Sequence, residues 1–285
     1  MWYLLIFAAV VMFGGQFFFN ARYQTLAGST VAASLTFSAL TGLFGLTGLF
    51  LINGLSLSVT PFTLGMAVWA ALNNLAFSYC AIRSLGRINL SVFSVFSMIG
   101  GMLLPFAAGL LAFSEFDRLA GKCLCLLFIA AGMLTTVRRQ EEKGAWKYYL
   151  GVFIFNGMSG VLSMIYTNAD LPKGSAADYS ILSAAVRILI AAVWLAFLLR
   201  KKKFSLEKRA ILDAAAYGVL NATANWLLLI ALIHVDGSMQ YPLVTGGVMV
   251  VSTVIGYFTA KKPTKKDVLA VGLSMAGMLC MLLPF

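Results

Sequence analysis

Charged residues are scarce in this chain, and the shortage excludes a soluble globular domain. Only 11% of the 285 residues are charged, 61% are hydrophobic, and the mean hydropathy is +0.91. A typical soluble domain has about 25% charged and about 45–50% apolar residues. Because an apolar helix of about 20 residues crosses the hydrocarbon core of a bilayer, the composition predicts an integral membrane protein. The long unbroken apolar runs lack the alternation of a transmembrane barrel, so the spans are predicted to be helices.

Residues that carry catalysis or bind metals are equally few. The chain has one histidine and four cysteines, and no acidic residue lies in the middle of an apolar segment. Paired carboxylates at membrane depth, His/Cys clusters and glycine-rich phosphate loops are all missing from the sequence, which therefore predicts no enzyme, metal site or cofactor. The cysteines lie in or at the ends of apolar segments and are interpreted as packing residues. They are Cys80, Cys123, Cys125 and Cys280.

Basic residues outnumber acidic ones by 21 to 10, but their placement does not indicate nucleic acid as a partner. Seventeen of them lie in short loops on one side of the predicted membrane, where Lys and Arg determine topology. Only Arg118, Lys122 and Lys173 lie on the opposite side, and Arg187 lies within a span. The positive-inside rule therefore predicts that the central polar linker is cytoplasmic and that both termini lie outside.

Ten apolar segments follow one another and predict ten transmembrane helices. They cover residues 2–20, 30–52, 62–82, 88–111, 119–137, 148–168, 178–199, 210–233, 238–259 and 266–284. The tandem at 89–137 recurs at the end of the chain, with a mid-helix glycine pair (Gly100/Gly101, Gly246/Gly247), a charged hinge and the same final Ala-Gly-Met-Leu. This duplication predicts five-helix repeats at 1–139 and 148–285, joined by a linker at 140–147. Since five is odd, the second repeat is predicted to be inverted, with a shared midplane cavity between two five-helix bundles.

Glycines recur at close spacing on three of the predicted spans. Small residues let helix backbones approach in lipid, so these glycines are interpreted as packing sites. They are Gly42, Gly45, Gly48, Gly157, Gly160, Gly272 and Gly277.

The duplicated hinge and helix ends carry a resemblance to a known family. The Ser-Glu-Phe-Asp-Arg-Leu hinge at 114–119, followed by a helix that ends in Ala-Gly, resembles the end of each repeat in the EamA-type drug/metabolite transporter superfamily. The second copy, from Tyr241 to Gly277, is also similar to the last two helices of the small multidrug resistance transporters. The resemblance implies a ten-helix transporter of two inverted repeats. Such proteins commonly keep both termini inside, which conflicts with the loop charge, and the hinge acid Glu115 is Lys261 in the second copy.

Polar side chains at membrane depth predict the lining of a transport pathway, because burying them is costly. Amides recur on the first, third, sixth and eighth predicted spans, and Asn221 and Asn225 share a helix face because they are four residues apart. The predicted substrate-binding residues are Gln16, Asn20, Asn73, Asn74, Asn156, Arg187, Asn221, Asn225, Trp226, Gln240 and Tyr241. The alternative interpretation is that these amides only hydrogen-bond between helices.

Arg187 is the one charge deep within a span. A guanidinium matches a carboxylate or phosphate in a bidentate fork, so it could bind an anionic substrate group. It could instead cap helix carbonyls and pair with a residue such as Asp178, near the start of the same helix. The likeness to small multidrug resistance transporters aligns Gly14 with their proton-binding glutamate, so proton-coupled export of a lipophilic cation is disfavoured.

Taken together, these features predict a secondary-active transporter, in the exporting direction, for a small polar metabolite such as an amino acid or a nucleoside-like compound. We expect alternating access around the midplane cavity, in the plasma (inner) membrane, as a monomer or homodimer whose partners are the small-molecule substrate and membrane lipid. Two alternatives stay open. One is a flippase for a lipid-linked phosphate or sugar, and the other is a membrane sensor or assembly protein that transports nothing.

Overall fold

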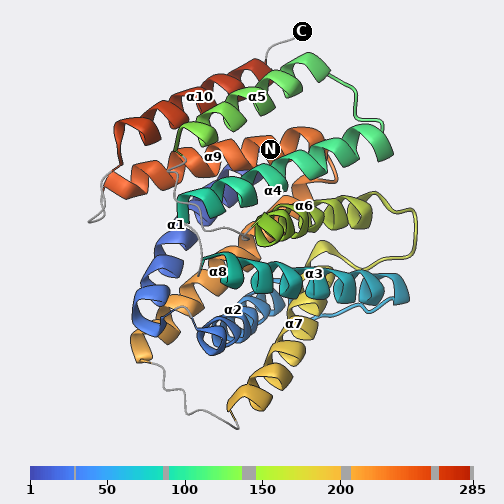
Figure 1. Ribbon diagram of the computed structural model, residues 1–285. Helices are drawn as coiled ribbons and strands as arrows, with labels where there is room; N and C mark the ends of the chain where they lie inside the picture. Colours follow the sequence, from blue (N-terminus) through green and yellow to red (C-terminus); the bar gives the residue numbers. More distant parts are fainter. Residues whose placement is uncertain (29, 86–89, 137–145, 200–206, 258–262, 283–285) are drawn as a thin grey trace.

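The computed structural model describes residues 1–28, 30–85, 90–136, 146–199, 207–257 and 263–282, and in them it consists of ten helices without strands (Figure 1). The helices are α1 Trp2–Ala27, α2 Val31–Ile52, α3 Pro61–Leu85, α4 Leu90–Ala112, α5 Leu119–Thr136, α6 Trp146–Asn168, α7 Ala176–Leu199, α8 Lys208–Ala231, α9 Gly237–Tyr257 and α10 Lys265–Leu282. The predicted all-helical fold class is confirmed, and nearly every helix end lies close to its predicted position.

Helix α1 is the exception, because it continues to Ala27 rather than ending near residue 20. The polar tail is held by specific contacts that a hydropathy run does not reveal. The Tyr23 hydroxyl is buried and donates a hydrogen bond to the Ala33 carbonyl at 2.8 Å. Arg22 forms an ion pair with Asp213 of α8, with Nε and Oδ2 3.4 Å apart.

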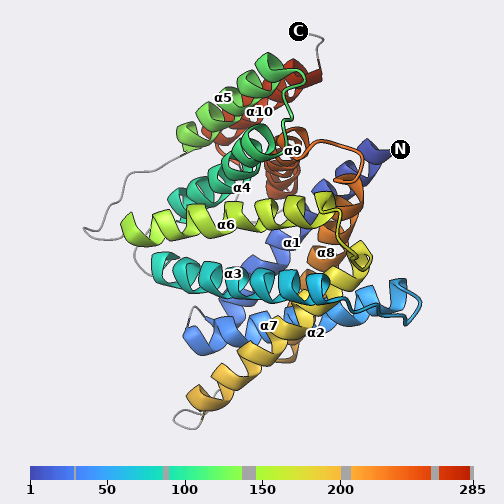
Figure 2. The same ribbon diagram turned by 90° about the vertical axis from the view of Figure 1, so that its right-hand side faces the viewer.

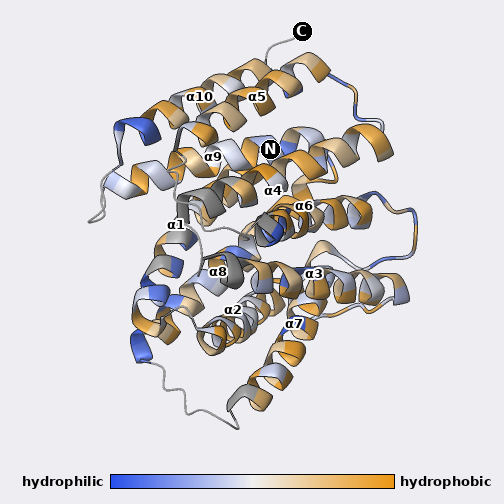
Figure 3. Ribbon diagram, viewed as in Figure 1, coloured by the Kyte–Doolittle hydropathy of each residue, from blue (hydrophilic) through white to orange (hydrophobic). Residues whose placement is uncertain are grey.

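Hydrophobic residues cover the helices, and hydrophilic residues gather at their ends and in the loops (Figure 3). Among the described residues, six helices are long and apolar enough to cross a membrane: α1, α2, α6 from Leu150, α7, α8 and α9. Shorter apolar stretches at Phe96–Ala112 and Leu119–Thr135 belong to α4 and α5. Asn73 and Asn74 at the centre of α3, and Lys265 and Lys266 at the start of α10, lower the mean hydropathy of those two helices. This pattern is that of a multi-pass membrane protein.

Eight of the helices form a closed ring. Around the ring the order is α1, α8, α2, α7, α3, α6, α4 and α9, which returns to α1. The two remaining helices, α5 and α10, pack against each other outside the ring and beside α9. Each helix of the ring therefore has neighbours from the other half of the chain, so the two predicted repeats do not pack as separate bundles. The two halves interleave. Helix α1 lies between α8 and α9 of the second half, and in the same way α6 lies between α3 and α4 of the first half.

Contacts between helix ends show that the halves run in opposite senses. Trp2 at the start of α1 stacks on His234 after the end of α8, with ring centroids 3.7 Å apart. After the end of α6, the Gly174 amide donates to the Thr63 hydroxyl at the start of α3, at 2.8 Å. Figure 2 places the N-terminus and the α2–α3, α4–α5, α6–α7 and α8–α9 loops on its right-hand side, which we call the N-terminal face. Helix α1 starts at this face whereas α6 ends there, as inverted repeats require.

Glycines allow the closest helix contacts. A Cβ atom at Gly157 would lie 2.4 Å from the Gly100 carbonyl oxygen, and one at Gly45 would lie 2.9 Å from that of Gly218. The predicted packing role also holds for three further glycines, where an added Cβ would come within 3 Å of a neighbouring helix: Gly42, Gly160 and Gly277. For Gly272 the prediction is wrong, because nothing lies within 4 Å of the added Cβ.

Candidate functional site

A chain of amides joins α1 to α8 at mid-depth. The Asn221 side-chain nitrogen donates to Oε1 of Gln16 at 2.8 Å, and that of Asn225 donates to the Asn221 carbonyl at 2.8 Å. Gln16 is buried, with 7% of its surface exposed. Asn20 lies one turn further along α1, where its side-chain oxygen accepts a hydrogen bond from Gln24 at 3.4 Å. The structure thus brings three predicted site residues together from opposite halves of the chain, whereas the bond of Asn20 stays within α1.

Asn225 is accessible, yet it lies away from the lipid-facing side of α8. Successive helical residues are about 100° apart, so Asn225 projects between Asn221, which contacts α1, and Ala222, which packs against Gly45 of α2. The exposed apolar residues Leu212 and Val219, at 68% and 42%, lie on the other side of the helix. Since α1 and α2 are the ring neighbours of α8, the Asn225 amide faces the interior of the ring.

Asn156 and Asn73 link adjacent helices of the ring. The Asn156 amide of α6 donates to the Ser97 carbonyl of α4 at 2.6 Å. The Asn73 amide of α3 donates to the Phe155 carbonyl of α6 at 2.8 Å. Both bonds agree with the interpretation of these amides as interhelical links. Both amides also lie near the middle of their helices.

Asn74 lies on a different side of α3 from Asn73. Its side-chain nitrogen donates to the Ala70 carbonyl one turn earlier in the same helix, at 2.9 Å. The exposed residues Trp69 and Leu72, at 66% and 53%, lie more than 100° around the helix from Asn74. Asn74 therefore faces the ring rather than the lipid, as Asn225 does on the equivalent helix of the second half.

The three other predicted aromatic and amide residues have separate placements. Gln240 is fully buried, and its amide donates to the Leu228 carbonyl at 3.0 Å, which ties α9 to α8. The Tyr241 hydroxyl donates to the Gly160 carbonyl of α6 at 3.1 Å. Because α4 separates α6 from α9 in the ring, the Tyr241 side chain reaches across α4 at Pro105, which also contacts Gly160. Trp226 follows Val219 by seven residues and lies on the exposed side of α8, so the structure does not bring it to the amides.

Arg187 lies at the centre of α7 and reaches towards α2 and α8. Its Nη2 would be 3.5 Å from a Cβ atom at Gly42, and the guanidinium lies near Tyr217 of α8. Pairing with Asp178 is wrong. That carboxylate accepts hydrogen bonds from the Ser58 and Ser175 amides at 3.1 and 2.8 Å, and so holds the α2–α3 loop against the start of α7.

Apolar side chains pack together in the part of the ring near the N-terminal face. One buried cluster joins Ile6 of α1, Phe106 of α4 and Leu228 of α8. A second joins Leu162 of α6 and Tyr179 of α7 to α3 and α8. These residues lie in the half of each helix nearer the N-terminal face, whereas the amides lie at mid-depth. The amides are therefore separated from that face by packed side chains.

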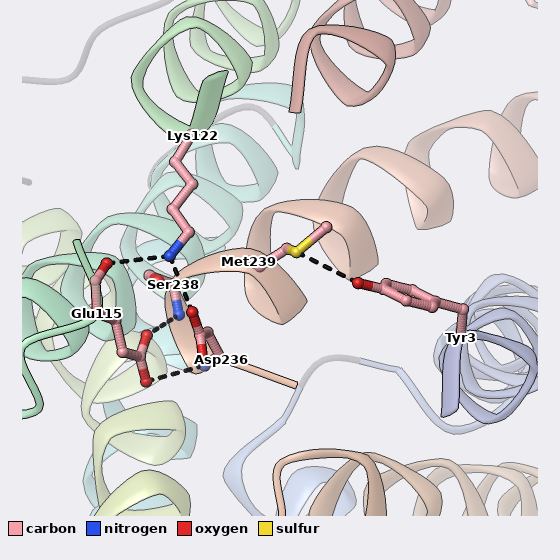
Figure 4. A network of polar contacts seen from close by, with 7 residues as sticks. Tyr3, Glu115, Lys122, Asp236, Ser238 and Met239 are labelled. Atoms are coloured by element: carbon pink, nitrogen blue, oxygen red, sulfur yellow. Dashed lines mark hydrogen bonds and ion pairs between the residues drawn. The ribbon is translucent and has the colours of Figure 1, made fainter. Parts of the chain in front are cut away.

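A polar network fixes the α4–α5 hinge to the start of α9 (Figure 4). The Glu115 carboxylate accepts hydrogen bonds from the Gly237 and Ser238 amides at 3.1 and 2.7 Å. The Lys122 ammonium, whose side chain is 2% exposed, donates to the Glu115 carbonyl at 3.0 Å and pairs with Asp236 at 3.1 Å. A carboxylate is favourable at a helix N-terminus, where amides lack intrahelical partners. Sequence reasoning named Glu115 as a hinge acid but did not identify this capping role, because the capped helix lies in the other half.

Loss of the Glu115 cap should destabilise the protein. Glu115→Ala removes two charge-assisted hydrogen bonds to α9, and helix caps contribute about 0.5–2 kcal/mol. We expect a loss of about 1–2 kcal/mol, seen as a lower Tm of the purified protein in detergent. Asp117→Ala in the same hinge is the matched control and should stay within about 0.5 kcal/mol of the wild type. An equal loss in both variants would contradict the capping role.

Comparison with known proteins agrees with this architecture. Residues 173–283 match the EamA-like transporter family. A solved crystal structure of a protein resembles the fold with a TM-score of 0.72 and 18% sequence identity, over 97% of this chain and 94% of that one. No curated protein matches the chain. Members of that family are membrane transporters of the drug/metabolite type rather than enzymes. Residues 173–283 are thus similar to the EamA-like transporter family, and the solved structure shares the fold of nearly the whole chain.

Proposed function

We propose that this protein is a secondary-active exporter that moves a small polar metabolite through the centre of the eight-helix ring. The observation that carries the proposal is the placement of Asn225, which is accessible although it faces away from the exposed apolar side of its helix. Amides both donate and accept hydrogen bonds, so the Gln16, Asn221 and Asn225 chain can exchange its internal bonds for bonds to a polar solute. An amino acid or a nucleoside-like compound has the groups that such a chain would bind.

Alternating access is supported by the packing near one end of the ring. Apolar clusters and bonds between loops occupy the N-terminal face, and a transporter needs a second state in which they separate. The loop charge would make the N-terminal face the outer one, in the plasma (inner) membrane with both termini outside. In that orientation, these packed clusters and loop bonds would have to separate for a substrate to leave on the outer side.

Flux through proteoliposomes tests this proposal. A thermal-shift screen against a metabolite library first selects compounds that bind, because a ligand of the folded state raises the Tm. Counterflow of a selected compound should then be measured for the wild type and for Asn225→Ala. Each hydrogen bond lost to the substrate is worth about 0.5–1.5 kcal/mol, and about 1.4 kcal/mol corresponds to a factor of ten. We therefore expect a drop in flux of up to about tenfold.

Leu212→Ala is the matched control, because it shortens an exposed side chain on the opposite side of the same helix. It should leave flux at the wild-type level. Equal flux in Asn225→Ala and Leu212→Ala would show that Asn225 does not bind the substrate. If the wild type binds compounds from the screen but transports none of them, the proposal of a transport activity is contradicted.

A further inference from the structure

Arg187 carries a charge that the described protein does not neutralise. An arginine stays protonated in proteins, and an unpaired charge at membrane depth is costly. The ion pairs within the described residues are Arg22–Asp213 and Lys122–Asp236, and neither includes Arg187. Its Nε atom is buried and has no hydrogen-bond partner among those residues. The guanidinium therefore has donors free for an additional acceptor.

The guanidinium belongs to the ring-facing side of α7. Ile188, the next residue, packs against Gly42 of α2, while Leu189 and Val193 form the exposed side at 66% and 58%. Ser183 lies one turn before Arg187 on the same face. The Ser183 hydroxyl is buried without a regular hydrogen bond in the described part of the chain, although the Tyr179 hydroxyl lies close to it. An unpaired cation and an adjacent hydroxyl thus share one turn of helix inside the ring.

This polar turn adjoins the amide chain through α8. Tyr217, which lies near Arg187, is four residues before Asn221 and hence about 6 Å away along the same helix face. The Phe37 ring of α2 packs on Tyr217, with ring centroids 4.8 Å apart, and supplies an apolar wall. A group bound at Arg187 would therefore lie within the length of a small metabolite from the amides.

We infer that Arg187 binds an acidic group of the transported metabolite, a carboxylate or a phosphate, in a subsite between α2, α7 and α8. This inference rests on the proposed function and names its substrate class. The planar guanidinium can donate two parallel hydrogen bonds to either group, and the amides of Gln16, Asn221 and Asn225 bind the remainder of the molecule. A small acid, including a zwitterionic amino acid, fits this arrangement better than a neutral solute, because only an anion neutralises the unpaired charge of the half-buried guanidinium.

Matched acid and amide pairs test the inference on the purified full-length protein. The probes are L-amino acids and small hydroxy acids, each with its carboxamide, together with inorganic phosphate and sugar phosphates. We expect at least one acid to raise the Tm while its uncharged counterpart does not. For that acid, Arg187→Gln should raise the apparent Kd about ten- to a hundredfold. Arg187→Lys should raise the Kd less, because lysine keeps the positive charge although it cannot donate the two parallel hydrogen bonds of a guanidinium.

The results distinguish a carboxylate ligand from a phosphate ligand, and failure of the Arg187 subsite from failure of the proposed transport function. Shifts by carboxylates alone, or by phosphate compounds alone, each support the subsite and identify its ligand. Carboxamides that shift the wild-type Tm as much as the acids would overturn the inference, even if Arg187→Gln does not fold. A panel without any shift by an acid would also overturn it. A neutral compound whose flux falls in Asn225→Ala but not in Arg187→Gln would overturn the subsite and leave the proposed transport function standing.

Discussion

Replacing Gln16 and Asn221 together by leucine should give a folded protein that no longer transports. The two amides share a hydrogen bond of 2.8 Å between α1 and α8, and Gln16 is nearly fully buried. Removing one partner leaves the other unsatisfied, at a cost of about 1–3 kcal/mol. Removing both replaces the bond by an apolar contact, and an interhelical hydrogen bond in a membrane averages only about 0.6 kcal/mol. The double variant should therefore be more stable than either single variant.

Transport should follow a different order. If the amides line the pathway, all three variants lose flux. Each leucine removes a group that binds the polar solute, whether or not the other amide is also replaced. The test measures Tm in detergent and counterflow in proteoliposomes for the wild type, the two single variants and the double variant. A double variant with both restored stability and wild-type flux would favour the other interpretation, in which this pair only links two helices.

Gly157→Ala should cause one of the largest losses of stability available from a single added methyl group. The new Cβ would lie 2.4 Å from the Gly100 carbonyl oxygen and 2.6 Å from the Leu104 Cβ, so α4 and α6 would have to separate. Overpacking costs about 1–3 kcal/mol, whereas replacing a helical glycine by alanine otherwise gains about 0.5–1 kcal/mol. We expect a net loss of about 1–2 kcal/mol and a matching fall in Tm.

Gly272→Ala is the matched control for that prediction. It makes the same change in the middle of α10, where nothing lies within 4 Å of the new Cβ. Its stability should equal or slightly exceed that of the wild type, because alanine loses less backbone entropy on folding. Similar Tm values for the two variants would show that α4 and α6 can move apart without cost, against the close packing seen here.

The sequence alone determined the helices and the depth of their polar residues. Ten hydrophobic runs predicted ten helices closely, because an apolar run of the length of a span is a property of one segment and needs no knowledge of its neighbours. Local spacing also predicted that Asn221 and Asn225 share a face, and that Gly157 and Gly45 permit close packing. The odd number of helices per repeat predicted the opposite sense of the two halves, in agreement with the contacts at the N-terminal face.

The tertiary structure decided which helices meet, and hence which side chains face one another. Gln16 bonds to Asn221, 205 residues away, and Glu115 caps a helix 122 residues away, because the halves interleave instead of forming separate bundles. The same packing bound Asp178 to a loop rather than to Arg187. The direction in which a helix presents a residue follows from its own periodicity, but what lies opposite depends on contacts between segments far apart in the chain, which no local pattern encodes.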